Sequence, residues 1–110
     1  MPLPERLSQH QCREWTVDVL GARLAVFEQG NAHGPVVILV HGWPDTHRLW
    51  DGVVSNLVDS FRVVTYDTRG HGCSTSQGTV TEMRIEQLAD DFLAVVDSVQ
   101  ADRPVHVLAH

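Results

Sequence analysis

Long apolar runs, basic clusters and internal repeats are all missing from this sequence. The longest apolar stretch, Val36 to Val40, is far too short to cross a bilayer. The N-terminus, "MPLPERLSQHQCREW", has no apolar core of the kind that a signal peptide needs. Only 8 Lys and Arg stand against 14 Asp and Glu, and they form no cluster. We therefore expect a cytoplasmic protein with no membrane span and no nucleic-acid partner.

Cysteine is also scarce. The two cysteines, Cys12 and Cys73, lie far apart and neither belongs to a C-x-x-C pair. This usage favours two reduced thiols over a disulfide. Cys73 lies in a glycine-rich loop and could serve as a nucleophile, but no base is identifiable beside it, so this interpretation is set aside.

The hydrophobic pattern predicts an α/β fold within one domain at most. The chain has 110 residues, of which 43% are hydrophobic, and a net charge of −6, which is typical of a globular domain. Strand and helix periodicities alternate after an initial hairpin, and this order favours a parallel sheet with crossover helices. The expected elements are a hairpin over 14–30, strands at Val36–Val40 and 61–67, a helix over 50–58, a helix over 85–99 that a capping box of Thr79 and Glu82 could open, and a strand over 105–110.

The loop "HGWPDT" follows the buried strand Val36–Val40. Ligands of such sheets bind at the carboxyl ends of the strands, so this loop is a candidate site. Gly42 permits a sharp turn, and Pro44 fixes it, which could leave the backbone N–H of Trp43 free to stabilise an oxyanion. The alternative is a plain strand-to-helix connection in which Asp45 or Thr46 caps the helix. The residues alone leave both interpretations open.

The loop "DTRGHGCS" follows the next parallel strand. Gly70 and Gly72 suggest a phosphate cradle, but the dinucleotide pattern G-x-G-x-x-G would need a glycine where Thr75 stands. Nucleotide binding therefore fails on spacing, and no cofactor is expected. Asp67 and Arg69 are expected to tie neighbouring loops together through charge-assisted hydrogen bonds.

Potential metal ligands occur at the same edge of the predicted sheet. They are His41, Asp45, His47 and His71, and no pair of them has the helical spacing of a zinc motif. We expect no metal site, and we expect His41 to be a hydrogen-bonded structural imidazole.

Three stretches together resemble a known family. "VVILVHGWPD", "FRVVTYDTRGHGCS" and "ADDFLAVVD" with "PVHVLAH" look like the first half of an α/β-hydrolase domain, from about Trp15 to His110. The H-G-x-P loop resembles the branch of epoxide hydrolases and haloalkane dehalogenases. The nearest likeness is to actinobacterial epoxide-hydrolase-like domains, some of which are fused to a short-chain dehydrogenase. Residues 1–12 are polar and contain two prolines, so we expect them to form a lead-in, and the resemblance makes 13–110 a partial α/β-hydrolase domain.

The resemblance implies roles for individual residues. Trp43 would provide one N–H of the oxyanion hole, and Trp43 and Pro44 would line the substrate site. The substrate would be a small apolar epoxide or ester. The residues implied to support the site are His41, Gly42, Asp45, Asp67, Arg69, Gly70 and Gly72.

The same resemblance places the nucleophile directly after His110. An Asp there would mark an epoxide hydrolase and a Ser an esterase or C–C hydrolase, and Ala109–His110 suits either elbow. The acid, the base and the lid lie later in such chains. The 110 residues alone are therefore expected to be inactive. The family strand order, 1-2-4-3-5, would also leave the last strand as an apolar, aggregation-prone edge. A non-catalytic remnant is the alternative.

Overall fold

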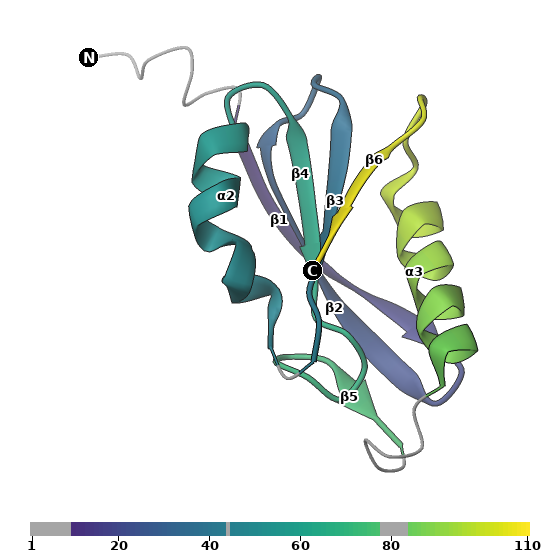
Figure 1. The fold of residues 1–110 in the computed structure, drawn as a ribbon. Helices are drawn as coiled ribbons and strands as arrows, with labels where there is room; N and C mark the ends of the chain where they lie inside the picture. Colours follow the sequence, from purple (N-terminus) through teal and green to yellow (C-terminus); the bar gives the residue numbers. More distant parts are fainter. Residues whose placement is uncertain (1–9, 44, 78–83) are drawn as a thin grey trace.

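The structure is a computed structural model, and it describes residues 10–43, 45–77 and 84–110. Strands and helices alternate after a leading hairpin, as the periodicity predicts (Figure 1). In chain order the elements are β1 (His10–Val19), β2 (Ala22–Asn31), β3 (Val36–Val40), the short 3-10 helix η1 (His47–Trp50), α2 (Asp51–Leu57), β4 (Arg62–Tyr66), β5 (Thr75–Ser76), α3 (Ile85–Val99) and β6 (His106–Ala109).

One mixed sheet organises the chain. Its strand order is β1-β2-β4-β3-β6, with β5 paired to β2. β2 is antiparallel to β1 and β4, whereas β3 is parallel to both β4 and β6. The order implied by the resemblance is confirmed, with β6 as the fifth strand of that series.

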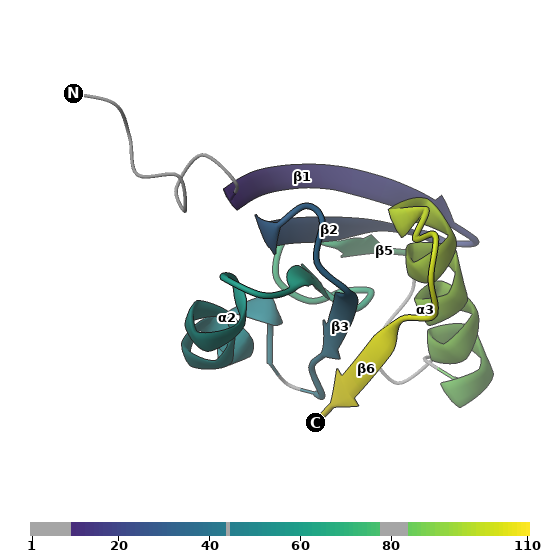
Figure 2. The same cartoon turned by 90° about the horizontal axis from the view of Figure 1, so that it is seen from above.

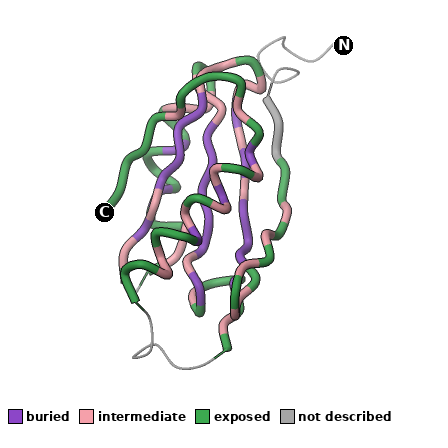
Figure 3. The backbone as a smooth tube through the Cα atoms, turned by 90° about the vertical axis from the view of Figure 1, so that its right-hand side faces the viewer, coloured by how far each residue is buried: buried purple, intermediate pink, exposed green. Residues whose placement is uncertain are grey.

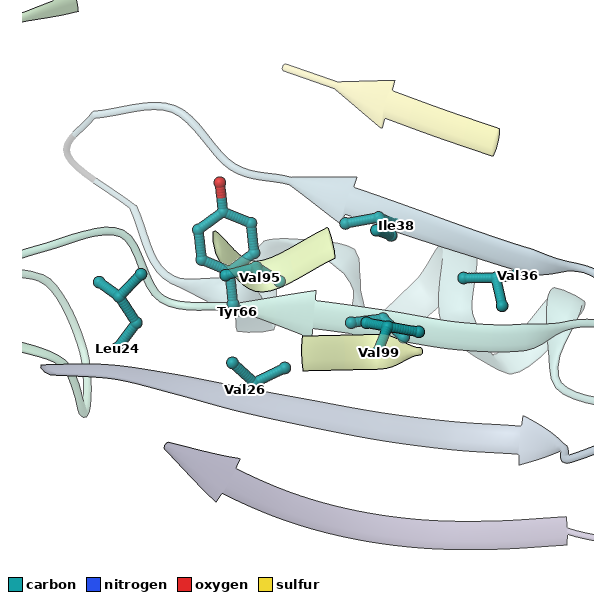
Figure 4. Close-up of a cluster of buried hydrophobic side chains, with 8 residues drawn as sticks. Leu24, Val26, Val36, Ile38, Tyr66, Val95 and Val99 are labelled. Atoms are coloured by element: carbon teal, nitrogen blue, oxygen red, sulfur yellow. The ribbon is translucent and has the colours of Figure 1, made fainter. Parts of the chain in front are cut away.

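Helices cover the sheet on both sides. α2 lies against one face and α3 against the other (Figure 2). β3 is apolar at every position because both of its faces are covered, and its residues alternate between two clusters. Buried positions concentrate in the central strands, while the outer helix surfaces are exposed (Figure 3). The larger cluster, on the α3 side, contains Leu24, Val26, Val36, Ile38, Val64, Tyr66, Val95 and Val99 (Figure 4).

Apart from shifts of one residue at strand ends, the strands differ from the expectation in two places. β1 begins at His10, so residues 10–12 belong to the first strand instead of the lead-in, because pairing with β2 continues as far as His10 opposite Asn31. β5 lies in a segment expected to be a loop. It has only two residues, Thr75 and Ser76, which pair with β2. Two residues are too few to show the alternating pattern by which a strand is predicted from sequence.

Three apolar positions on the core-facing stripes predicted for the two helices are exposed, namely Val53, Ile85 and Ala89. Val53 is 37% exposed because the seven-residue helix α2 reaches the core through Val54 instead. Ile85 is 74% exposed because α3 joins the larger cluster only from Phe92 onward. The capping box of Thr79 and Glu82 lies outside the described residues.

No helix within the described ranges combines the length and the apolar character that crossing a membrane requires.

Candidate active site at the carboxyl ends of the parallel strands

The loop after β3 and the end of β6 are in direct contact. The N–H of His110 donates to the carbonyl oxygen of Val40 at 3.0 Å, which continues the parallel pairing past β6. A Cβ placed on Gly42 would lie 2.8 Å from the carbonyl oxygen of His110, closer than real Cβ contacts come. Gly42 is therefore required here by the close approach of two backbone segments. The chain leaves β6 beside the loop that begins at His41.

The side chain of His41 joins this loop to the one after β4. Its ring is buried, with 3% of the residue exposed. Nδ1 lies 2.9 Å from the carbonyl oxygen of Gly42, and Nε2 accepts the backbone N–H of Thr68 at 3.0 Å. A carbonyl can only accept and an amide N–H can only donate, so the proton resides on Nδ1. The two polar partners account for the burial of this imidazole.

Asp67 holds the loop after β4 from its centre. The carboxylate is fully buried and accepts the backbone N–H of His47 at 2.7 Å, its Nδ1–H at 2.8 Å and the backbone N–H of Cys73 at 2.9 Å. Burial acts to raise the pKa of Asp67, but these hydrogen bonds and the His47 charge outweigh it and hold that pKa below its usual range. Gly72, at φ +52°, turns tightly here, and a Cβ on it would overlap the carboxylate.

Arg69 points away from the loop and into the molecule. Its Nε and Nη2 donate to the two carboxylate oxygens of Asp91 on α3, both at 2.8 Å, and Nη2 also donates to the carbonyl oxygen of Leu20 at 3.0 Å. The hydrogen bonds to Asp91 raise the pKa of Arg69 above its ordinary value. These bonds of Arg69 attach the loop to α3 and to the turn of the β1–β2 hairpin. The next residue, Gly70, has a φ of +76°, a backbone conformation that favours glycine.

Residues 41–43 and 45–46 of the loop "HGWPDT" follow the carboxyl end of β3. The N–H of Asp45 donates to the carbonyl oxygen of Gly42 at 3.0 Å, and no described residue accepts a hydrogen bond from the N–H of Trp43. The Trp43 side chain is 71% exposed. Thr46 accepts the N–H of Arg48 at 3.2 Å and so caps the short 3-10 helix η1, whereas α2, the helix for which a cap by Asp45 or Thr46 was considered, has no side-chain cap. Pro44 lies outside the described residues.

The potential metal ligands have other partners. Asp45 accepts the N–H of Thr46, His47 bonds to Asp67, and the rings of His41 and His71 meet edge to face at 5.8 Å. Across the described ranges, no three His, Cys, Asp or Glu side chains gather as a metal ion would need. Cys73 is an exposed free thiol whose backbone N–H is used by Asp67.

Sequence reasoning missed the partners that complete this network. Nothing in the sequence singles out Thr68, and His47 stands out there only as a potential metal ligand. The burial of Asp91 could have been predicted from the sequence, because Asp91 lies four residues before Val95 and eight before Val99, on the apolar stripe of α3. A carboxylate on a buried stripe indicates a buried ion pair.

The profile of a protein family described as alpha/beta hydrolase fold matches residues 35–110. The chain belongs to the α/β-hydrolase fold family. The family and the fold predicted by the resemblance are thus confirmed, and the relatives of this α/β-hydrolase include epoxide hydrolases.

Two curated mycobacterial proteins and one solved structure illustrate the likeness. "Probable oxidoreductase EphD" of Mycobacterium tuberculosis is 50% identical over 90 residues, which are 82% of this chain and 15% of that protein. "Epoxide hydrolase A" of the same organism is 37% identical over 95 residues, covering 86% of this chain and 30% of the relative. The epoxide hydrolase VrEH1 of Vigna radiata superimposes with a TM-score of 0.77 at 30% identity, over 94% of this chain and 31% of that one. The α/β-hydrolase chain thus spans less than a third of each.

Proposed function

We propose that these residues form the part of an epoxide hydrolase that supplies one oxyanion donor, the N–H of Trp43, to an aspartate nucleophile directly after His110. The observation that carries this proposal is the close approach of Gly42 to the carbonyl oxygen of His110, which would lie 2.8 Å from a Cβ at position 42. A residue following His110 would emerge beside the loop that holds Trp43. The names of the epoxide hydrolase relatives support the choice of substrate class.

The proposed reaction has two steps. The aspartate carboxylate attacks an epoxide carbon, the C–O bond of the epoxide breaks, and its oxygen takes a proton from an acid elsewhere in the protein. This forms an ester between the enzyme and the substrate. Water then attacks the carbonyl carbon of the ester, and the Trp43 N–H stabilises the negative oxygen that develops before the diol leaves. No cofactor takes part.

A single-turnover reaction of the full-length protein in heavy-oxygen water tests this mechanism. With an aspartate nucleophile, the oxygen added in the first turnover comes from the carboxylate, so the first diol carries no label and the enzyme becomes labelled. A labelled diol in the first turnover would contradict the covalent route. Replacement of the residue after His110 by a side chain without a nucleophile should abolish turnover.

Two further results would redirect the proposal. A serine after His110, with hydrolysis of p-nitrophenyl esters in place of epoxides, would identify a serine esterase or C–C hydrolase of the same fold. The 110-residue chain by itself is expected to turn over neither substrate, because it contains no residue in the nucleophile position. Turnover by that chain would contradict the proposed nucleophile.

A further inference from the structure

The peptide unit between Gly42 and Trp43 contains both groups on which the site depends. Its carbonyl oxygen, on Gly42, receives the Nδ1–H of His41 at 2.9 Å and the N–H of Asp45 at 3.0 Å. Its N–H, on Trp43, is the proposed oxyanion donor. A planar trans peptide points its N–H away from its C=O. Two hydrogen bonds that hold the oxygen in place therefore also fix the direction of the Trp43 N–H.

Of these two donor groups, only the His41 imidazole is also hydrogen-bonded to a residue outside the loop. The N–H of Asp45 belongs to the same turn and would move with it. The imidazole of His41 is held from its other side, where Nε2 accepts the N–H of Thr68 at 3.0 Å. The neighbouring residue Asp67 is anchored in turn by His47 and Cys73. The His41 ring thus links the peptide unit before Trp43 to the loop after β4, which is itself held in place by hydrogen bonds.

We propose that His41 is a positioning residue that directs the Trp43 N–H toward the reacting oxygen by clamping the Gly42 carbonyl. This inference rests on the proposed function, because the N–H needs a fixed direction only if it serves as an oxyanion donor. Because the ring is buried, it would act through the Gly42 carbonyl and not by direct contact with the substrate. Its effect is expected on the chemical step, since a donor that points a little away from the oxyanion loses most of its value in the transition state.

Substitution of His41 by Asn or by Gln tests the roles of the two ring nitrogens one at a time. The side-chain nitrogen of Asn occupies nearly the place of Nδ1, so His41→Asn keeps a donor for the Gly42 carbonyl and loses the acceptor for Thr68. The side-chain oxygen of Gln reaches the place of Nε2, so His41→Gln keeps the acceptor and loses the donor. His33→Gln is a matched control, because His33 is exposed on the turn before β3.

In the full-length protein, we expect His41→Gln to lower kcat on the order of tenfold to a hundredfold, and KM should fall or stay unchanged, because slower hydrolysis of the ester lets the ester intermediate accumulate. His41→Asn should restore kcat to within about threefold of the parent enzyme, and His33→Gln should leave both constants unchanged. Equal losses in the Asn and Gln variants would overturn the inference, because the clamp on the Gly42 carbonyl would then not be the feature that matters. A rise in KM alone would overturn it as well.

Nitrogen NMR of the unsubstituted protein tests the hydrogen bond from His41 to the Gly42 carbonyl without any substrate, because it shows which ring nitrogen carries the proton. We expect the His41 ring to carry its proton on Nδ1 and to keep the Nε2 position unprotonated. A proton on Nε2 would overturn the inference whether or not the protein is active. A parent enzyme that hydrolyses neither epoxides nor esters, but shows the Nδ1–H form, would instead contradict the proposed function and leave the clamp itself supported.

Discussion

Tyr66, the last residue of β4, is buried in the larger core cluster with 2% of its surface exposed (Figure 4). Burial, followed by the negative charge of Asp91, raises the pKa of Tyr66 to about 12. The chain has one tyrosine and no lysine. Ultraviolet absorbance of tyrosinate therefore reports a single group in a pH range where no lysine titrates.

We expect the stability of the folded chain to decline above about pH 10 because of Tyr66. Below the pKa of an unfolded tyrosine both states keep the proton, so this contribution is fully present. Between about pH 10 and 12 the unfolded chain loses the proton and the folded chain retains it, which costs about 1.4 kcal/mol per pH unit. Urea midpoints measured across this range, together with the tyrosinate absorbance, test the prediction.

The variant Tyr66→Phe provides the control for that titration. It removes the ionisable hydroxyl and keeps the ring, so its urea midpoint should fall less steeply over the same pH range. A tyrosinate signal with a midpoint near the ordinary value of about 10 in the folded chain would contradict the prediction.

At the scale of elements, a buried ion pair attaches α3 to the loop after β4. The side chains of Arg69 and Asp91 are each 4% exposed and share two hydrogen bonds. Arg69 also reaches the carbonyl of Leu20 in the hairpin turn. One guanidinium thus links three segments that are distant in the sequence.

Breaking this pair on one side should cost more than replacing both partners. Asp91→Leu leaves the Arg69 charge buried and uncompensated, and we expect a loss of about 3–5 kcal/mol in the free energy of unfolding. The double variant Arg69→Met with Asp91→Leu should be destabilised less than Asp91→Leu alone. Urea unfolding of Arg69→Met, Asp91→Leu and the double variant gives the coupling energy, and additive losses would contradict a strongly coupled pair.

At the scale of the whole molecule, the sheet has an open edge at β6. All four residues of β6 are exposed, with Val107 at 50% and Leu108 at 47%, and β3 is the only neighbour of this strand in the described part of the sheet. Figure 1 shows β6 at the border of the sheet. Unpaired backbone groups beside apolar side chains form a template for pairing with another chain.

We expect the isolated 110-residue chain to self-associate through this edge. Val107→Lys should shift sedimentation toward the monomer, because a lysine on an edge strand opposes pairing with a second strand. Val53→Lys is the matched control, since Val53 is 37% exposed but lies on α2. Equal effects of the two lysines would show that added charge, and not the β6 edge, governs association.

The sequence by itself determined the order of the longer strands and helices, the parallel part of the sheet and the two loops of the candidate site. These follow from local features, because an apolar run such as Val36–Val40 or the stripe of α3 displays its periodicity within a few residues. The glycine in "HGWPDT" and the charged residues in "DTRGHG" likewise marked the two loops without any knowledge of their neighbours.

Only the tertiary structure decided which residues those loops contact. Asp67 meets His47 across 20 positions, Arg69 meets Asp91 across 22, and His41 meets Thr68 across 27. The pairing of β5, the extension of β1 to His10 and the exposure of Val53 depend on distant partners in the same way. Such contacts leave no local period in the sequence, because each arises from how separate elements pack against one another.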